Sequence, residues 1–383
     1  MNNVTKFILV LIVAALCISS AYALGYSLYH NPAQTTSITC DVCSIDDSGE
    51  VWLGVTQDGM EFLNASYGDD IIVEFGKDAF AAVYVKDYAG IPAYTTFLSY
   101  VSSKNGICFG VYGGKLSDYV NPNIGDSVIL SLGGKNRYYS AMPDYAEGIS
   151  DDRKDYPSDQ AFANYRILDG SDMKNGIIQR SSTPWTDGRG EISDSFLRNA
   201  GVDSLVCLDR DESELKEIAK QKPDLYASEL YQNGKVKTRL LDKAILCNPK
   251  DVRWTLESIL NSEGEVGLSC LYGKDQTGIF CLILLGLAGA TLEEAKEEYM
   301  TSITNLYGIE KNSDEYEAVY LTTLFRTLFF IDYPDMLDRM LDVDWDATGL
   351  GHISLQSMVT DYLINYVGMT AEEIDSLKER IAK

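Results

Sequence analysis

The spacing of apolar residues changes once along the chain, between residues 148 and 160, and this change divides the sequence in two. Before it, apolar and polar residues alternate in short stretches bounded by Gly and Asp. A period of two with closely spaced turn residues is typical of antiparallel strands, so residues 35–147 are predicted to form a small all-β module, either a barrel or a sandwich. The polar segment 148–160 is predicted to be a linker.

After the linker, residues 161–383 combine short apolar strands with helical patterns. Residues 204–208 form a brief apolar run, which is typical of a buried strand. Residues 278–289 are apolar on every side and predict a helix inside the domain. Thr291 and Thr370 each open a capping box at the start of a later helix. This order predicts an α/β domain with a central, mostly parallel sheet flanked by helices.

A leader is predicted at the N-terminus. Lys6 precedes an unbroken apolar run over residues 7–18, and Ala21-Tyr22-Ala23 presents small residues for cleavage. This layout predicts a signal peptide over residues 1–23 and export of the protein, either secreted or to the cell envelope. If it is not cleaved, residues 7–24, counted generously, are just long enough to anchor the chain in a bilayer. Membrane contact is expected only in that case.

Composition excludes several classes of function. The chain has 32 Lys and Arg against 57 Asp and Glu, so its net charge is −25, which argues against nucleic-acid binding. The only histidines are His30 and His352, and Cys40 and Cys43 form a single C-x-x-C pair, so no metal site is expected. The two cysteines are either a redox or disulfide pair of an exported protein, or unconnected residues on a strand.

Cys270 is the strongest candidate for chemistry. It belongs to the segment S-C-L-Y-G-K-D-Q-T-G, residues 269–278, which lies between a predicted strand and the buried helix. A turn in this position directs backbone N–H groups and the positive helix end at one point, which makes an anion site. A cysteine there is expected to have a lowered pKa and to be alkylated readily at mildly acidic pH. The alternative is a cysteine that simply packs under a glycine-containing turn.

This segment resembles the phosphate-binding loop of bacterial protein tyrosine/serine phosphatases, H-C-x-x-G-K-D-R-[TA]-G. The resemblance extends to Asn164-Tyr165-Arg166, to residues 176–182 and to residues 299–308. The β half also resembles the module that precedes the phosphatase domain in secreted members. The resemblance implies hydrolysis of a phosphomonoester through a phosphocysteine, without a cofactor, on a phosphorylated protein or a small phosphomonoester.

The resemblance also assigns roles to individual residues. It makes Cys270 the nucleophile and Asp275 a candidate general acid. Asp209 and Asp211, just after the predicted strand 204–208, are further candidates for the acid. The phosphate-binding residues it implies are Leu271, Tyr272, Gly273, Lys274, Gln276, Thr277 and Gly278.

Two departures from the family pattern fall inside the loop. Gln276 stands where the family has an arginine, and Ser269 stands where it has a histidine. An arginine binds two phosphate oxygens with charge-assisted hydrogen bonds, and losing one transition-state donor costs about 10²–10³ in rate. Two functions therefore compete: an exported phosphatase with impaired activity, and a pseudophosphatase that binds a phosphorylated or anionic partner without turnover. A third interpretation makes the β module a surface-interaction module on an α/β scaffold.

Overall fold

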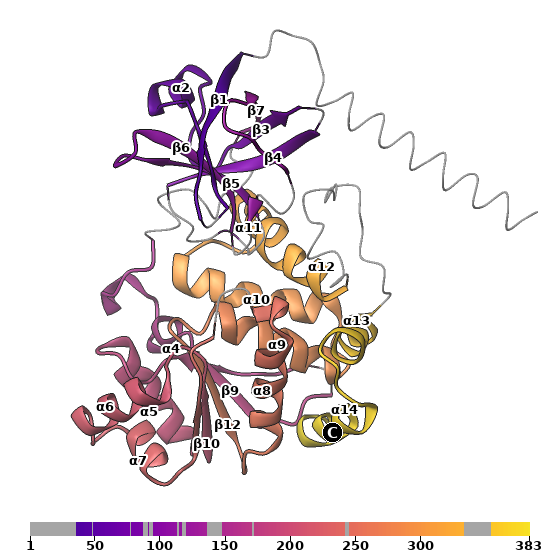
Figure 1. Ribbon diagram of the computed structural model, residues 1–383. Coiled ribbons are helices and arrows are strands. Elements are labelled where there is room, and N and C mark those ends of the chain that lie inside the picture. The colour runs from indigo at the N-terminus through magenta and orange to yellow at the C-terminus, as the bar shows by residue number, and fades with distance from the viewer. Residues whose placement is uncertain are drawn as a thin grey trace, which may run out of the picture.

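In the computed structural model the chain forms two bodies, a β-barrel followed by an α/β domain (Figure 1). The structure describes residues 36–47, 49–76, 78–86, 91, 95–112, 115–116, 120–135, 148–170, 172–241, 245–332 and 354–383. The predicted signal peptide over residues 1–23 lies outside these ranges. Within them, no helix combines the length and the apolar character needed to cross a bilayer.

Seven strands close into the N-terminal barrel, in the spatial order β1-β2-β6-β5-β4-β3-β7. Neighbouring strands are antiparallel, except that β4 and β5 run parallel. The predicted all-β module is thus a closed barrel. Its elements are β1 (Ser37–Ile45), β2 (Val51–Leu53), the short helix α2 (Gln57–Phe62), β3 (Asp70–Phe75), β4 (Asp78–Val85), β5 (Thr96–Val101), β6 (Gly106–Val111) and β7 (Ser127–Gly134).

Strand β1 shows how side-chain alternation separates the inside of the barrel from its surface. Cys40 and Val42 are buried in the barrel core, whereas Cys43 is exposed. Residues three apart on a strand point to opposite faces, so Cys40 and Cys43 form no disulfide and both thiols are free. Of the two interpretations of the C-x-x-C pair, the structure supports the second, in which the cysteines are unconnected residues on a strand.

A five-stranded sheet in the order β11-β10-β12-β9-β8 forms the centre of the second domain. Only the edge strand β8 is antiparallel to its neighbour, so the predicted mostly parallel sheet is confirmed. The strands are β8 (Arg166–Ile167), β9 (Ile178–Ser182), β10 (Ser204–Cys207), β11 (Val236–Thr238) and β12 (Val266–Cys270).

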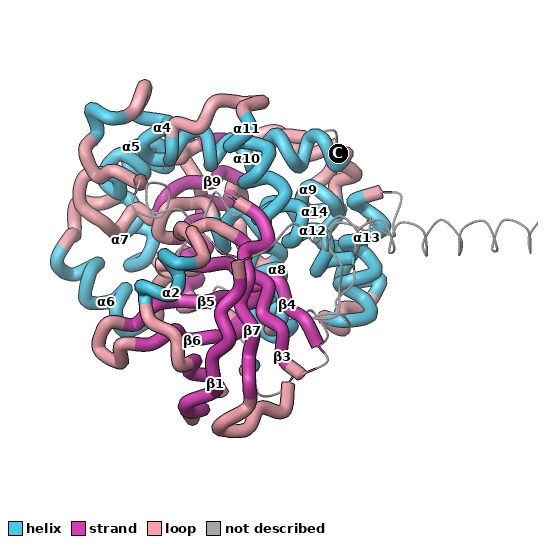
Figure 2. Tube along the Cα trace, turned by 90° about the horizontal axis from the view of Figure 1, so that it is seen from above, coloured by secondary structure: helices cyan, strands magenta, loops and turns pink. Residues whose placement is uncertain are grey.

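Helices cover both faces of this sheet, and all the labelled helices except α2 belong to the α/β domain (Figures 1 and 2). One face packs against α5 (Arg189–Ala200), α6 (Glu212–Gln221) and α7 (Tyr226–Gln232). The other face carries a larger core, built with α8 (Pro249–Leu260), α9 (Asp275–Leu287), α10 (Leu292–Tyr307), α13 (Leu355–Asp361) and α14 (Ala371–Ile381). The shorter segments are the 3₁₀ turns Arg153–Asp155 and Ile245–Cys247, α4 (Asp159–Ala163), α11 (Asp314–Val319), the π-helical Tyr320–Phe325, α12 (Arg326–Asp332) and the π-helical Tyr362–Tyr366.

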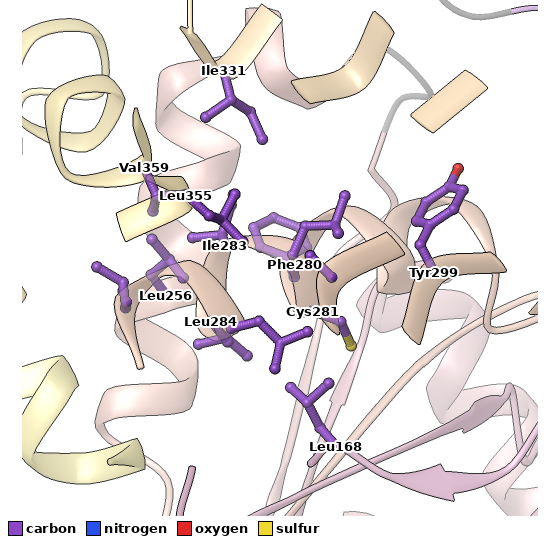
Figure 3. Packing of buried hydrophobic residues seen from close by; sticks show 14 of the residues in the cluster. Leu168, Leu256, Phe280, Cys281, Ile283, Leu284, Tyr299, Ile331, Leu355 and Val359 are labelled. Atoms are coloured by element: carbon purple, nitrogen blue, oxygen red, sulfur yellow. The ribbon is translucent and has the colours of Figure 1, made fainter. Parts of the chain in front are cut away.

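Helix α9 is the central helix of the larger core, as its uniformly apolar sequence predicted. Phe280, Ile283 and Leu284 have no exposed surface, and Figure 3 shows them surrounded by side chains that include Leu256 of α8 and Leu355 of α13. The helix follows β12 after only four residues. Its packing therefore fixes both ends of the connecting loop, residues 271–274.

Arg189, the first residue of α5, binds the predicted linker, residues 148–160, to the α/β domain. Its Nη2 donates to the Ser150 carbonyl at 2.7 Å and to the Tyr156 hydroxyl at 2.9 Å. Its Nη1 donates to the Phe162 carbonyl, and its guanidinium lies 4.2 Å from the centre of the Phe162 ring. The guanidinium also lies 5.5 Å from the ring of Tyr272, so part of the predicted linker reaches the edge of the Cys270 loop.

Replacing Phe280 by alanine is expected to lower the free energy of unfolding of the α/β domain by about 3–5 kcal/mol, because the cavity left in a fully buried site cannot collapse completely. Urea denaturation followed by tryptophan fluorescence measures it, since Trp185 is buried in the same domain. Leu321→Ala is the control: Leu321 is 54% exposed and its loss should change stability by no more than about 0.5 kcal/mol. Equal effects of the two substitutions would show that α9 is not tightly packed.

Candidate functional site

Cys270 is the last residue of β12, at the carboxyl end of the central strand of the sheet. β12 lies between β10 and β9, and Cys270 pairs in register with Ser182 of β9. The Cys270 carbonyl accepts from the Thr183 amide at 2.8 Å and from the Gly273 amide at 3.0 Å. In open α/β sheets, ligands bind beyond the carboxyl ends of the strands, and Cys270 occupies that position.

Gly273 gives the loop its shape. Its φ is +63°, a backbone conformation that costs a side chain energy, and a Cβ there would lie 2.5 Å from the carbonyl carbon and oxygen of Ser181. Asn164 Nδ2 donates to the carbonyls of Tyr272, at 3.0 Å, and Gly273, at 3.2 Å, and Arg180 Nη2 also donates to the Gly273 carbonyl. Because peptide C=O and N–H groups point in opposite directions, this pulls the Gly273 carbonyl into the domain and turns the Lys274 amide away from it.

Cys270 is almost fully buried, and its protonation differs from the prediction. Burial raises the pKa of the Cys270 thiol, and the side-chain and backbone hydrogen bonds from Thr277 only partly offset this. The charges of Asp275 and Asp209 act in the same direction as burial. The expected lowering of this pKa is therefore wrong, because the prediction counted the loop amides and the helix end but not the cost of placing a thiolate in a dry environment.

Lys274 and Gln276 are the polar side chains of the predicted loop that follow Gly273. Lys274 is 7% exposed, and its Nζ lies 2.9 Å from the Tyr307 hydroxyl and 3.3 Å from Asp275 Oδ1. Gln276 Nε2 lies 3.5 Å from the Leu241 carbonyl. Lys274 is the only residue between 269 and 278 with a formal positive charge, so the loop has one cation where the family pattern has two.

The remaining predicted loop residues divide into packed and exposed positions. Thr277 is buried and acts to lower the pKa of Cys270, as described above. Gly278 lies against Tyr299, where a Cβ would come within 2.9 Å of the ring. Leu271 is 42% exposed, and Tyr272 is half-buried beside Arg189.

Of the three aspartates considered as general acid, Asp209 lies in the best environment. Cys207 Sγ donates to Asp209 Oδ1 at 3.2 Å, and Arg210 Nη1 lies 3.2 Å from its Oδ2. Burial raises the pKa of Asp209, although the Arg210 charge and the hydrogen bonds from Cys207 and Thr183 oppose it. Asp209 therefore keeps its proton to higher pH than an ordinary aspartate, which suits a general acid.

Asp211 and Asp275 have other partners. Asp211 is the N-cap of α6: its Oδ1 accepts from the Glu214 amide at 2.8 Å and from the Ser213 hydroxyl at 2.6 Å, and these bonds lower its pKa. This side chain therefore stabilises a helix end, and its lowered pKa suits a general acid less well than that of Asp209. Asp275 begins α9, is half-exposed on its side chain and pairs with Lys274.

The buried charged groups behind the loop could not be given a role from the sequence. Arg166, Arg180 and Glu298 form a cluster of charged side chains, and Arg180 is fully buried. Arg180 Nη1 lies 2.7 Å from both Glu298 oxygens, and Arg166 Nε donates to Glu298 Oε1 at 2.9 Å. Both arginines lie in segments that carry the family resemblance, but an arginine in a strand does not reveal its partner on a distant helix.

A comparison with protein families agrees with the resemblance. A family model described as "Tyrosine phosphatase family" matches residues 162–383. No curated protein matches the chain. Solved structures with limited likeness include an uncharacterized conserved protein from Thermotoga maritima, 17% identical with a TM-score of 0.24, and a conserved hypothetical protein from Thermus thermophilus, 19% identical with a TM-score of 0.19. Each match covers 26% of this chain and 37% of the other, so the chain spans little more than a third of either structure.

The alkylation rate of Cys270 by iodoacetamide is expected to keep rising above pH 9. The raised pKa keeps the thiol protonated at neutral pH, and the reactive thiolate forms only as the pH passes that pKa. Mass spectrometry of the peptide that carries Cys270 measures the rate at each pH. Thr277→Val should move the profile to still higher pH, because it removes a hydrogen bond that favours the thiolate. A plateau below pH 8 would show that the loop amides and the helix end outweigh burial.

Gly273→Ala is expected to weaken binding of inorganic phosphate by more than about tenfold, since the added Cβ would push the loop off Ser181. Isothermal titration calorimetry measures the affinity. Gly289→Ala is the matched control: Gly289 also has a positive φ, of +81°, but a Cβ there meets no atom closer than 3.8 Å. It should cost stability and leave phosphate binding unchanged. Equal phosphate affinity in both variants would separate the loop from anion binding.

Proposed function

This chain belongs to the tyrosine phosphatase family, and from that premise we propose that it is an exported phosphatase that hydrolyses phosphomonoesters slowly, through a phosphocysteine at Cys270. The family match confirms the resemblance and supports a phosphatase-like function for residues 162–383. Export rests on the predicted leader over residues 1–23. The substrate class is a phosphorylated protein or a small phosphomonoester.

One observation carries the proposal: Cys270 ends the central strand under a loop whose carbonyls are bonded back into the domain. The hydrogen bonds of Asn164 and Arg180 to these carbonyls leave the opposite side of the loop to peptide N–H groups and to the first turn of α9. Unpaired N–H groups at a helix start bind phosphate. A phosphoryl group held there would lie against the Cys270 sulfur.

The proposed reaction has two steps. In the first, Cys270 loses its thiol proton to solvent, and the thiolate Sγ then bonds to phosphorus as the bond from phosphorus to the leaving oxygen breaks. That oxygen takes a proton from Asp209. In the second, water attacks phosphorus, the S–P bond breaks, Asp209 takes the proton of the water, and inorganic phosphate leaves. Asp209 suits this role better than Asp275, because burial raises its pKa whereas Asp275 is half-exposed and paired with Lys274.

Slow turnover is proposed on two grounds. The neutral amide of Gln276 replaces a guanidinium that would bind two phosphoryl oxygens as charge develops. Burial also keeps the Cys270 thiol protonated at neutral pH, so little thiolate is present to attack. The same two observations favour a second candidate function, a pseudophosphatase that binds a phosphorylated or anionic partner without turnover.

Gln276→Arg is expected to raise kcat/KM on an aryl phosphate by at least about 10²-fold, the scale of one preorganised transition-state donor. Gln276→Lys is the matched control: it adds the same charge without the fork, so its gain should be smaller. The gain should vanish in the Cys270→Ser background. No activity in wild type or in Gln276→Arg would establish the pseudophosphatase, whereas high wild-type activity that Gln276→Arg leaves unchanged would show that Lys274 and the amides suffice.

A further inference from the structure

The cluster of Arg166, Arg180 and Glu298 holds more positive than negative charge. Burial opposes ionisation of Glu298, but the two guanidinium groups outweigh it and keep its pKa below the usual range. Burial, together with the Arg180 charge, lowers the pKa of Arg166 to about 10, which still leaves it charged at neutral pH. Two cations and one anion give a net charge of +1. Within the described residues, Glu298 is the only carboxylate that pairs with either guanidinium.

This charge is removed from solvent. The exposed fractions of the side chains are 0% for Arg180, 8% for Glu298 and 17% for Arg166. A buried charge without a counter-charge is costly. Cys281 lies close enough to influence the pKa of both arginines, but burial raises its own pKa to about 12, so it remains a neutral thiol.

The cluster lies directly behind the Cys270 loop. Arg180 pairs with Leu268 in the β9–β12 register, and Cys270 is two residues further along β12, so Arg180 and Cys270 face the same side of the sheet. Arg166 pairs with Arg180 across β8 and β9 and faces that side too. Arg180 also donates to the Gly273 carbonyl. An anion at Cys270, whether its thiolate or a bound phosphate, is the counter-charge that this arrangement can use.

We propose that the Arg166–Arg180–Glu298 cluster is an electrostatic support for the anion held at Cys270, and that Glu298 sets the size of the supporting charge. The inference rests on the proposed function, because phosphate is the anion concerned. In this chain the cluster partly replaces the positive charge that the loop lacks at Gln276. All three are positioning residues, because Arg180 reaches the loop through the Gly273 carbonyl and the others act through their electric field.

The test changes the charge of the cluster in both directions and leaves Arg180, which bonds the loop, in place. Glu298→Gln gives +2, Arg166→Gln gives 0, and the double variant returns to +1 with the ion pair removed. Inorganic phosphate affinity at low ionic strength should rise about tenfold in Glu298→Gln, fall about tenfold in Arg166→Gln and return close to wild type in the double variant. The pH profile of Cys270 alkylation should move by about one unit, down in Glu298→Gln and up in Arg166→Gln.

Lys311→Gln is the matched control, since its loss changes the net charge as Arg166→Gln does. Lys311 pairs with Glu297, which lies on the same helix as Glu298, and the two side chains are 55% and 54% exposed, so solvent screens the charge and phosphate affinity should change less than about twofold. A purely structural role predicts a different ranking of phosphate affinities, in which every cluster variant binds more weakly than wild type and the double variant binds most weakly. That order would overturn the proposal.

Two further outcomes keep the inference separate from the proposed function. If Glu298→Gln does not fold, the double variant is compared with Arg166→Gln. Higher phosphate affinity in the double variant supports the electrostatic role of the cluster, and equal or lower affinity overturns it. If wild type binds no phosphate, the proposed function fails, but the alkylation profiles still decide whether the cluster acts on Cys270, because they need no substrate. If wild type binds phosphate but the affinities of the variants do not follow the net charge of the cluster, only the inference about the cluster fails.

Discussion

The hydrogen bond from the buried Arg180 guanidinium to the Gly273 carbonyl is the contact on which the site depends. It joins strand β9 to the loop, and through Glu298 the same side chain is held to α10. A guanidinium can satisfy several acceptors in fixed directions, so it keeps strand, loop and helix in one arrangement. The tightly packed helix α9 then fixes the far end of the loop. The loop thus owes its geometry to groups buried on both sides of it, and its own side chains contribute chemistry more than shape.

Much of the fold could be predicted from the sequence because it depends on local patterns. Alternating residues predicted an all-β module, either a barrel or a sandwich, and the uniformly apolar segment predicted α9. Thr291 and Thr370 form the capping boxes expected of them. The support of the loop could not be predicted, since Asn164 and Tyr272 are 108 residues apart and nothing local connects them. The thiol protonation was missed for a related reason: burial arises from the assembled core. Asp211 shows the converse: its position in the sequence suggested a general acid, whereas in the structure its carboxylate caps a helix.

Gln276 separates two properties of a phosphate loop that are usually found together, its shape and its charge. The shape depends on Gly273, on the packing of Gly278 against Tyr299 and on the carbonyl hydrogen bonds, all of which this chain has. The charge depends on side chains, and here it is reduced to Lys274 within the loop. Ground-state binding tolerates such a reduction better than catalysis does, because a transition state concentrates charge where a fork of donors would be needed.

The closure of the barrel limits how the N-terminal body can recognise another protein. Each of its described strands already has two hydrogen-bonded neighbours, so these strands offer no free edge to which an incoming peptide could add as an extra strand. Recognition by this body must therefore use side chains and connecting segments. Substitutions can change such contacts without disturbing the backbone hydrogen bonds between the strands. A closed barrel can therefore keep its fold while the specificity of its surface changes.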